Sequence, residues 1–266
     1  MVEENQVKSV IENIRRLGRV KSNIYSEEAY CDVEQFAYNE NAAVLIRSDH
    51  GAKRLYFCYV DEQSLIKLLS CDAAPGYSDA VIEFMTRDPE EFSDLLKQIG
   101  FAPIARMMRM SARDISQGLN NKALDLYSND TVGIVPAVSD AEEINAILWK
   151  TFDTRVSHLQ NDDEIEDSIR RQEFTVHKNE EGRIDALLQA QVQPKKFYIN
   201  QIVNTADKSV IHAILQSRLR KFSDEGGKYV YAWVDRDNIA SVKFHEKYGI
   251  KHDGMWNMVY AAEKQD

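Results

Sequence analysis

Two segments of the sequence carry the same pattern 149 positions apart, as Asp88 and Asp237 show (88 + 149 = 237). Each segment has an apolar run, an Arg-Asp pair, a helical pattern of apolar residues, a glycine and a second apolar run. The matching positions are Arg87 and Arg236, Asp88 and Asp237, and Gly100 and Gly249. Because an internal duplication decides the architecture of a whole chain, the sequence predicts two similar domains.

A polar stretch between the two segments marks the expected domain boundary. Residues 111–130 are rich in polar side chains and contain Gly118, Asn120 and Asn121, which are typical of a linker. The chain has 266 residues, enough for two domains of ordinary size. We therefore expect a first domain at residues 1–115, a linker at 116–130 and a second domain at 131–266.

The spacing of apolar residues predicts alternating helices and strands in both halves. Asp88 and Pro89 begin a helix, because they supply an N-cap and a first-turn proline. In the first half we expect helices at 5–17, after Asp61 and at 88–99, and strands at 42–46, 55–60, 80–85 and 104–110. In the second half we expect helices after Ser139 and at 163–171, 208–222 and 238–248, and strands at 132–135, 174–177, 184–192, 197–203, 229–234 and 255–260.

The formal net charge of −10 argues against nucleic acid as a partner, because a field of this sign repels phosphate. The same field attracts cations, so we expect a small-molecule amine or a basic peptide as partner. A second copy of the chain, in a homodimer, is a further candidate. The apolar runs are far shorter than the roughly 20 residues that span a bilayer, so we expect no membrane partner.

The cysteines and the N-terminal residues predict a cytoplasmic protein. Cys31, Cys58 and Cys71 form no C-x-x-C pair, and their odd number suits a reducing compartment. The first residues carry no export signal. The six histidines show no metal-ligand spacing, so we expect no metal site.

The most specific stretch of the sequence is VDRDNIASVKFHEKYGI, which begins at Val234 and ends at Ile250. It resembles the signature N-x-x-A/S-x-x-F-Y-E-K-x-G-F of the GNAT superfamily of acyl-CoA N-acyltransferases. The resemblance implies an α/β (α+β) fold with two tandem GNAT-like domains. Each domain would have a mixed, mostly antiparallel twisted sheet flanked by helices.

The resemblance also implies positions for an acyl-CoA co-substrate such as acetyl-CoA. Asn238 takes the place of the family's Asn beside the pantetheine arm, and it is also a plain N-cap candidate. The backbone groups of Ile202 and Val203 would bind the thioester carbonyl and the pantetheine. These residues lie on the expected strand 197–203, whose side chains offer amides instead of the carboxylate base found in many family members.

The segment that should hold the cofactor phosphates departs from the family pattern. The family opens its long helix with a loop of the type R/Q-x-x-G-x-G/A, whose glycines let backbone N–H groups approach the pyrophosphate. Here Lys208, Ser209 and Val210 stand at this helix start, with Asp207 before them and no glycine. Lys208 and Ser209 can still contact a phosphate, whereas Val210 and Asp207 oppose it.

The catalytic candidates lie on the helix at 238–248. His245 takes the place of a tyrosine that the family often uses to protonate the leaving thiolate, and imidazole can do the same. Tyr248 is the nearest hydroxyl, although its spacing suits the buried face of the helix. The matching position in the first half is Leu96, whose side chain cannot exchange a proton, so we expect the first domain to be non-catalytic. The acidic run 162–167 could recognise a cationic amine or simply form a solvated helix face.

Three functions follow from these observations. The first is an N-acetyltransferase that moves an acyl group from acyl-CoA to an amine by direct attack in a ternary complex. The second is a non-catalytic GNAT-like binding or regulatory protein with a repurposed pocket, which the missing glycines favour. The third, an aminoacyl-tRNA-dependent transferase, conflicts with the net charge of −10.

Overall fold

A computed structural model gives the fold and describes residues 2–70, 77, 79–119 and 132–262. The chain forms two compact units, and neither unit is one continuous piece of sequence. Unit 1 contains Met1–Arg106, Thr154–His158 and Met255–Asp266, and unit 2 contains Met107–Asp153 and Leu159–Gly254. Most of the expected linker lies outside the described residues, including residues 123–127, for which the sequence also suggests a short helix.

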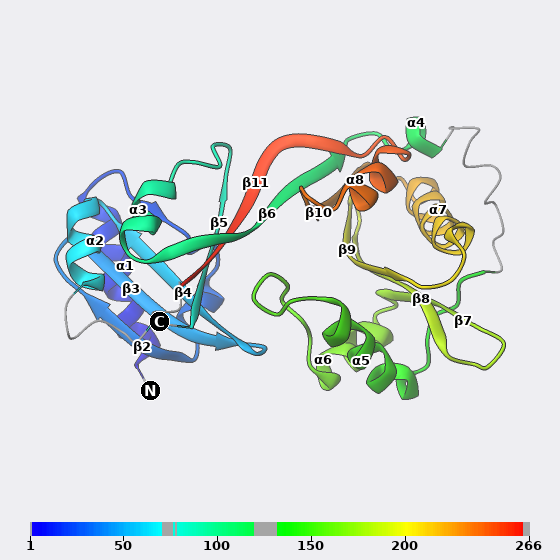
Figure 1. Cartoon of the computed structure of the whole chain (residues 1–266), viewed down its shortest axis with the longest axis horizontal. Coiled ribbons are helices and arrows are strands. Elements are labelled where there is room, and N and C mark those ends of the chain that lie inside the picture. Colours follow the sequence, from blue (N-terminus) through cyan, green and yellow to red (C-terminus); the bar gives the residue numbers. More distant parts are fainter. Residues whose placement is uncertain (1, 71–76, 78, 120–131, 263–266) are drawn as a thin grey trace. The chain divides into compact units, whose positions relative to one another are not determined.

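Unit 1 is a sheet with helices on both of its faces (Figure 1). Its strand order is β2-β3-β4-β5-β11, and β1 pairs with β4. One face is covered by α1, the other by α2 and α3. The elements are α1 (Glu4–Leu17), β1 (Lys21–Ser22), η1 (Glu27–Tyr30), β2 (Val33–Tyr38), β3 (Ala42–Asp49), β4 (Ala52–Tyr59), α2 (Glu62–Leu69), β5 (Ala80–Thr86) and α3 (Ser93–Gln98).

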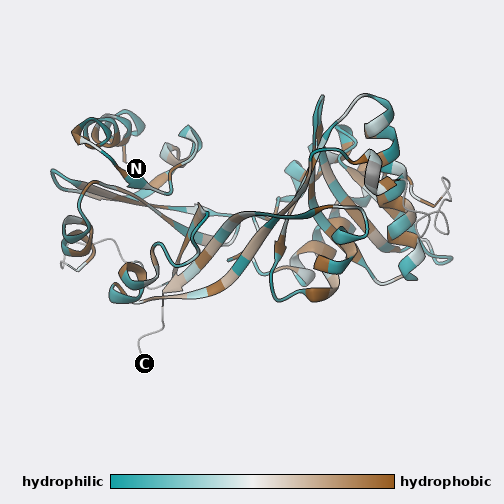
Figure 2. Ribbon diagram, turned by 90° about the horizontal axis from the view of Figure 1, so that it is seen from above, coloured by the Kyte–Doolittle hydropathy of each residue, from teal (hydrophilic) through white to brown (hydrophobic). Residues whose placement is uncertain are grey.

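Unit 2 has the same layered design, with the strand order β6-β10-β9-β8-β7. One sheet face packs against α7, and α5 and α6 pack on the other. The elements are α4 (Ser116–Leu119), η3 (Val138–Asp140), α5 (Ala141–Thr151), α6 (Asp162–Arg170), β7 (Phe174–Lys178), β8 (Ile184–Gln193), β9 (Lys196–Asn204), α7 (Lys208–Asp224), β10 (Tyr229–Asp235) and α8 (Ile239–Glu246). The strands β6 (Phe101–Ala112) and β11 (Lys251–Ala262) belong to both units, because β6 enters unit 2 at Met107 and β11 enters unit 1 at Met255. Figure 2 shows polar and apolar residues alternating along these elements, as half-buried helices and strands require.

The two long strands β6 and β11 are exchanged between the units. In unit 2, β6 pairs with β10, with Met110 opposite Ala232. In unit 1, β11 pairs with β5, with Met258 opposite Phe84. The strands β5 and β10, which begin at Ala80 and Tyr229, lie 149 positions apart (229 − 80 = 149) and each accepts the last strand of the other repeat.

Two expected elements differ from the observed ones. The helix expected from Asp88 begins only at Ser93, because Thr86 Oγ1 accepts the Asp88 N–H (3.0 Å) and Asp88 Oδ1 accepts the Glu90 N–H (3.1 Å), which forms a turn. The strand expected at 132–135 is reduced to an isolated bridge between Ile134 and Val176. An additional strand, β2, was not expected. Within the described residues, no helix has the length and apolarity needed to cross a bilayer.

The strand exchange predicts that shortening the C-terminus damages the N-terminal unit. A chain that ends at Gly254 lacks Met258, Val259 and Tyr260, which are at most 2% exposed. Burying each such side chain contributes about 1.5–3 kcal/mol, so unit 1 should lose on the order of 5 kcal/mol. Amide hydrogen exchange of β4 and β5 should increase strongly, while β8 and β9 stay protected.

A chain that ends at Ala262 is the control, because it keeps the whole of β11. Its amide exchange should match that of the full chain. Loss of protection in β8 and β9 instead of β4 and β5 in the shorter chain would contradict the exchanged pairing.

Candidate functional site

The parallel strands β9 and β10 of unit 2 separate at their carboxyl ends. Their ladder covers four positions and ends where Ala232 opposes Ile199. β9 then continues to Asn204 and β10 to Asp235. Within the described residues, no hydrogen bond joins these two continuations. Backbone N–H and C=O groups therefore line an opening, and a buried ligand with amide or carbonyl groups could satisfy them.

Ile202 and Val203, the predicted backbone ligands of a thioester, lie on β9 in this opening. They come after Ile199, the last residue of β9 that pairs with β10. On their other edge they belong to the ladder with β8, opposite Leu188 and Leu187. The other edge of β9 faces the opening at these positions, and the binding of a thioester by their backbone groups stays a prediction.

A bulge bends β9 at the start of the opening. Gln189 of β8 opposes Gln201 and the next residue, Ala190, opposes Ile199, so Asn200 is the extra residue. Asn200 Nδ2 donates to Gln189 Oε1 at 3.0 Å. Gln189 Nε2 in turn donates to Gln160 Oε1 at 2.8 Å, so a row of three amide side chains ends at the opening.

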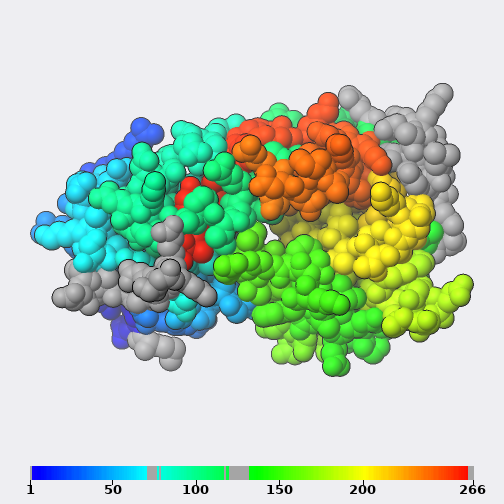
Figure 3. Space-filling model, in the orientation of Figure 1, coloured from blue at the N-terminus to red at the C-terminus, as the bar shows by residue number. Residues whose placement is uncertain are grey.

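The space-filling view shows a hollow at this place (Figure 3). The orange segment with α8 and the green segment with α5 and α6 border the hollow, and the yellow segment with β9 lies at its floor. We call this hollow, with the opening between β9 and β10, the unit 2 cleft.

The start of α7 holds an internal carboxylate where a phosphate would bind. Asp207 Oδ1 accepts hydrogen bonds from Ser209 N (2.8 Å) and Ser209 Oγ (2.6 Å). Lys208 is exposed, and Val210 is partly buried in the core under α7. The helix N-terminus is therefore already capped by an anion, and of the predicted phosphate contacts only the exposed Lys208 keeps its side chain unpaired within the described residues.

Asn238 is the N-cap of α8, with Oδ1 accepting the Ser241 N–H at 3.0 Å. This bond occupies one acceptor site of the amide and starts the helix as the sequence pattern indicated. The Nδ2 group keeps its capacity to donate to a ligand.

His245 of α8 is buried, with 3% of its surface exposed. Its Nδ1 donates to Ser241 O at 2.8 Å, and its Nε2 has no hydrogen-bond partner among the described residues. Burial lowers the pKa of His245 below its usual value, outweighing the opposite effect of the bond to Ser241. His245 is therefore neutral at pH 7, and Nε2 is a proton acceptor, whereas the sequence predicted a proton donor.

Tyr248 lies in the core between α7 and α8. Its side chain is fully buried, and Oη donates to His212 O at 3.1 Å while accepting from His212 Nδ1 at 2.9 Å. Burial, with a smaller effect of the nearby Lys247, lowers the pKa of His212 to about 4, so this ring is neutral. Tyr248 thus has its proton committed to a backbone carbonyl, which leaves no hydroxyl of this residue for the cleft.

Unit 1 has an equivalent pair of parallel strands, and the chain itself fills the space between them. β4 and β5 pair at only two positions, the second with Arg54 opposite Val81. Because β3 covers one edge of β4 along its length, β1 pairs with the other edge, where β5 has diverged. We call residues 21–25 the unit 1 plug.

Asn23 binds the backbone of both diverging strands. Its Oδ1 accepts from Phe57 N at 2.7 Å, and its Nδ2 donates to Leu55 O at 3.1 Å and to Glu83 O at 3.0 Å. The residue is 1% exposed. Tyr25 Oη continues the contact by accepting from Met85 N at 2.7 Å. The plug occupies in unit 1 the place that stays open in unit 2, and no sequence pattern pointed to it.

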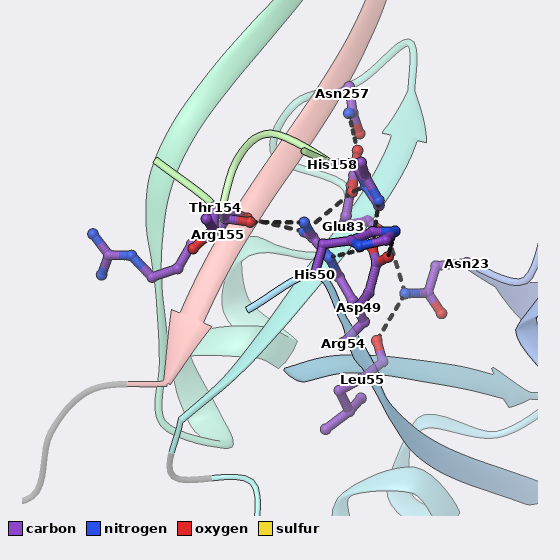
Figure 4. Close-up of polar contacts among 10 residues, drawn as sticks. All are labelled: Asn23, Asp49, His50, Arg54, Leu55, Glu83, Thr154, Arg155, His158 and Asn257. Atoms are coloured by element: carbon purple, nitrogen blue, oxygen red, sulfur yellow. Dashed lines mark hydrogen bonds and ion pairs between the residues drawn. The ribbon is translucent and has the colours of Figure 1, made fainter. Parts of the chain in front are cut away.

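A charged cluster in unit 1 brings together residues that are distant in sequence (Figure 4). The Arg54 guanidinium, 2% exposed, donates to Asp49 Oδ2 at 3.3 Å and to Glu83 Oε2 at 3.4 Å. It also donates to Thr154 O (3.0 Å) and Arg155 O (2.9 Å), two backbone carbonyls of the segment Thr154–His158. A buried guanidinium needs such partners, because an unpaired buried charge is strongly destabilising.

His158 lies between the two carboxylates of this cluster. Its Nδ1 is 2.5 Å from Asp49 Oδ2 and its Nε2 is 2.7 Å from Glu83 Oε2. The other oxygen of Glu83 accepts a hydrogen bond from the Asn257 side chain. Both imidazole nitrogens donate, so His158 is held as a cation and cannot act as a base. We call Asp49, Arg54, Glu83 and His158 the His158 clamp.

The pKa values of the clamp follow from its geometry. Burial opposes the charged form of His158, but the hydrogen bonds to Asp49 and Glu83 raise its pKa to about 9. Burial also opposes the charged carboxylate of Asp49, yet His158 and Arg54 hold its pKa well below the usual range. The pKa of Glu83 is lowered in the same way against the effect of its burial. The clamp is therefore fully ionised at pH 7.

The other predicted features are structural in the described part of the chain. In the acidic run, Glu164 forms a capping box with Asn161, and Glu166 and Asp167 bind Arg170. A second cavity of about 400 Å³ lies where β9 begins, beside the last turns of α7, and Arg171, Arg218, Lys221, Glu173 and Glu225 supply its charges. No group of three metal-ligating side chains comes together among the residues that the structure places.

Removing the Asn23 side chain should destabilise unit 1. Asn23→Ala leaves Phe57 N, Leu55 O and Glu83 O without their partner, at roughly 1 kcal/mol or more for each buried group. We expect a loss of about 3 kcal/mol in the free energy of unfolding by urea. Asn5→Ala, at an exposed position of α1, is the control and should change stability by less than about 0.5 kcal/mol. Equal stabilities of the two variants would contradict the role given to the plug.

The stabilisation by His158 should disappear at high pH. Its pKa is raised from 6.5 to about 9 in the folded chain, so the contribution is complete below pH 6.5 and is lost as the pH rises through 9. The imidazole is 48% exposed, and solvent screening reduces the effect to on the order of 1 kcal/mol. The melting temperature of the unmodified chain should fall more between pH 7 and 10 than that of His158→Gln.

His177→Gln is the matched control, because His177 also contacts a carboxylate, Asp185, at 2.6 Å. This variant should keep the pH dependence of the unmodified chain. A His158→Gln variant with that same dependence would show that the imidazole of His158 does not titrate near pH 9.

Comparison with known proteins places the fold. No family model matches the chain, and no curated protein matches it. It is similar to a tandem GNAT protein from the clavulanic acid biosynthesis pathway, with a TM-score of 0.56 and 10% identity over 100% of this chain and 98% of that one.

Two further solved structures are similar. A GCN5-related N-acetyltransferase from Sphaerobacter thermophilus has a TM-score of 0.53 and 12% identity, covering 84% of this chain and 76% of that one. A glucosamine N-acetyltransferase region of a fungal multi-domain β-N-acetylglucosaminidase has a TM-score of 0.56 and 11% identity, covering 83% and 31%. The chain therefore has the fold of the GNAT superfamily, in its tandem form.

Proposed function

We propose that the chain is an acyl-CoA-dependent N-acyltransferase whose reaction takes place in the unit 2 cleft. The observation that carries this proposal is the contrast between the two units. The opening between β4 and β5 is filled by Asn23, whereas the opening between β9 and β10 has no such occupant among the described residues. An extended thioester arm with amide groups suits an opening lined by backbone donors and acceptors.

In this proposal, a neutral amine attacks the thioester carbonyl directly. The C–N bond forms, the C–S bond breaks, and the electron pair leaves with the thiolate. Backbone groups of Ile202 and Val203 bind the thioester and its arm, and Asn238 Nδ2 contributes a donor. The amine gives up one proton, and His245 is the candidate to hold it, because its Nε2 is unprotonated and has no hydrogen-bond partner in the part of the chain that the structure describes.

The acceptor in this proposal is a small amine or a basic peptide. The net charge of −10 favours a cationic acceptor and disfavours a transfer RNA donor. The chemistry needs no metal ion, and the proposed location is the cytoplasm.

A second candidate function is binding without acyl transfer. The observation that favours it is the Asp207 carboxylate, which already occupies the anion position at the start of α7. A cofactor pyrophosphate would have to approach this charge without the help of glycine backbone. Unit 2 would then hold a ligand with amide groups but no phosphate.

Titration calorimetry with acetyl-CoA and longer acyl-CoA esters distinguishes the two functions. Removing the Asp207 charge should strengthen binding, so Asp207→Ser should bind the CoA ester about two- to fivefold more tightly, given the ~0.3–1 kcal/mol of a charge near a helix N-terminus. Serine is itself a good N-cap, so α7 should stay intact.

Asp224→Ser is the matched control, because it changes the net charge equally at the opposite end of α7. It should leave the affinity for CoA esters unchanged. If neither the unmodified chain nor Asp207→Ser binds any acyl-CoA, the proposed acyltransferase is wrong and the second function is favoured.

A further inference from the structure

The His158 clamp fixes a segment that leads directly to the unit 2 cleft. The segment Thr154–His158 connects α5 with α6, yet it belongs to unit 1. Arg54 holds two of its backbone carbonyls, and Asp49 and Glu83 hold the His158 ring at its two nitrogens. Side chains from three strands, β3, β4 and β5, therefore bind Thr154, Arg155 and His158 (Figure 4).

The next residues in the chain, Leu159 and Gln160, belong to unit 2. Leu159 is fully buried in the core formed with α5 and α6. Gln160 follows, and its side chain exchanges hydrogen bonds with Ser168 of α6 at 3.0 and 3.2 Å. Gln160 Oε1 is also the acceptor of Gln189 Nε2. The start of the amide row is thus two residues from the clamp.

The row ends at a residue of the cleft itself. Gln189 Oε1 accepts from Asn200 Nδ2, and Asn200 is the bulged residue immediately after the last position at which β9 pairs with β10. A bulged residue is not fixed by the ladder, so its side-chain bond determines where it points.

We propose that His158 and Arg54 are positioning residues for the cleft, and that they orient the Asn200 side chain through Gln160 and Gln189. The importance of this orientation for acyl transfer rests on the proposed function, whereas the orientation itself does not. The clamp contacts no cleft residue directly and acts through the covalent chain and three amides.

The charged groups around His158 make the proposed orientation of Asn200 depend on pH. The groups around it are Asp49, Arg54 and Glu83, with His50 beside Asp49 at 3.8 Å and the neutral Asn257 on Glu83. Tyr56 interacts with both carboxylates and Tyr25 with Glu83, and burial raises the pKa of both hydroxyls above the usual value. The Arg155 side chain points away from the cluster (Figure 4). Because both carboxylates and Arg54 stay charged as the pH rises, His158 is the group that loses its proton and one of its two carboxylate bonds.

Carbon-detected NMR of the full chain, labelled with ¹³C and ¹⁵N at asparagine, tests the proposal. The signal of the Asn200 side-chain carbonyl is assigned with Asn200→Ser. In His158→Gln this signal should shift or broaden, while in the control His177→Gln it should not. A folded His158→Gln variant with an unchanged Asn200 signal overturns the proposal.

The unmodified chain provides the same readout if His158→Gln fails to fold. Between pH 7 and 10, the Asn200 carbonyl should shift with the same midpoint as the His158 ring carbons. An Asn200 signal that stays unchanged while His158 titrates overturns the proposal.

Neither measurement needs a ligand, so their outcome is independent of whether acyl-CoA binds. Where transfer is observed, His158→Gln and Asn200→Ser should each raise KM for the amine more than they lower kcat. The double variant should be no worse than the poorer single variant. Fully additive losses overturn the coupling, while a failure to bind acyl-CoA counts only against the proposed function.

Discussion

The unpaired backbone groups of a strand that leaves its neighbour are the constraint on which both units depend. Parallel strands that separate leave N–H and C=O groups along two inner edges, and such groups are costly unless something binds them. Unit 1 satisfies them internally, through β1 and the amide of Asn23, which bonds to both strands. In unit 2, no described residue occupies the corresponding edges. One repeated fold thus carries one closed and one open version of the same slot.

The helix that follows each pair of separating strands is also capped by a group of the chain itself. At the start of α7, Asp207 supplies the anion that in other settings a bound phosphate would supply. Asp61 does the same for α2, where it accepts the Ser64 N–H at 2.9 Å. Both units therefore cap this helix with their own carboxylate. The open strand edges and the anion position at the helix start are occupied by different residues. One of the two can therefore be filled by the chain while the other stays open.

The sequence predicted local structure well and spatial neighbours poorly. The apolar spacing gave α1, α7, β5 and β10 nearly as observed, because amphipathic periods depend on burial within one element. The signature around Asn238 and Gly249 indicated the fold, which the comparisons confirm. No sequence pattern indicated the exchange of β6 and β11, because β11 has the same apolar residues whether it pairs in unit 1 or in unit 2. Asn23 and His158 were missed because their partners, Glu83 for both, lie 60 and 75 positions away.

His245 and Tyr248 show the same limit at the level of chemistry. Their positions on α8 follow from the pattern, but burial decides which of their atoms can move a proton. His245 keeps an unpaired Nε2, while the Tyr248 hydroxyl is spent on His212. No spacing rule separates these outcomes, because desolvation depends on the elements packed around the helix.

The exchanged strands have a consequence for how the chain is made. Unit 1 is missing its last strand until β11 leaves the ribosome, although its other segments, Met1–Arg106 and Thr154–His158, are complete 97 residues earlier (255 − 158 = 97). At roughly 5–20 residues per second, that interval is on the order of ten seconds. Throughout it, the edge of β5 that β11 will cover is an unpaired template for other nascent strands. Translation speed over the second half of the chain therefore sets how long this edge of the N-terminal unit stays unpaired.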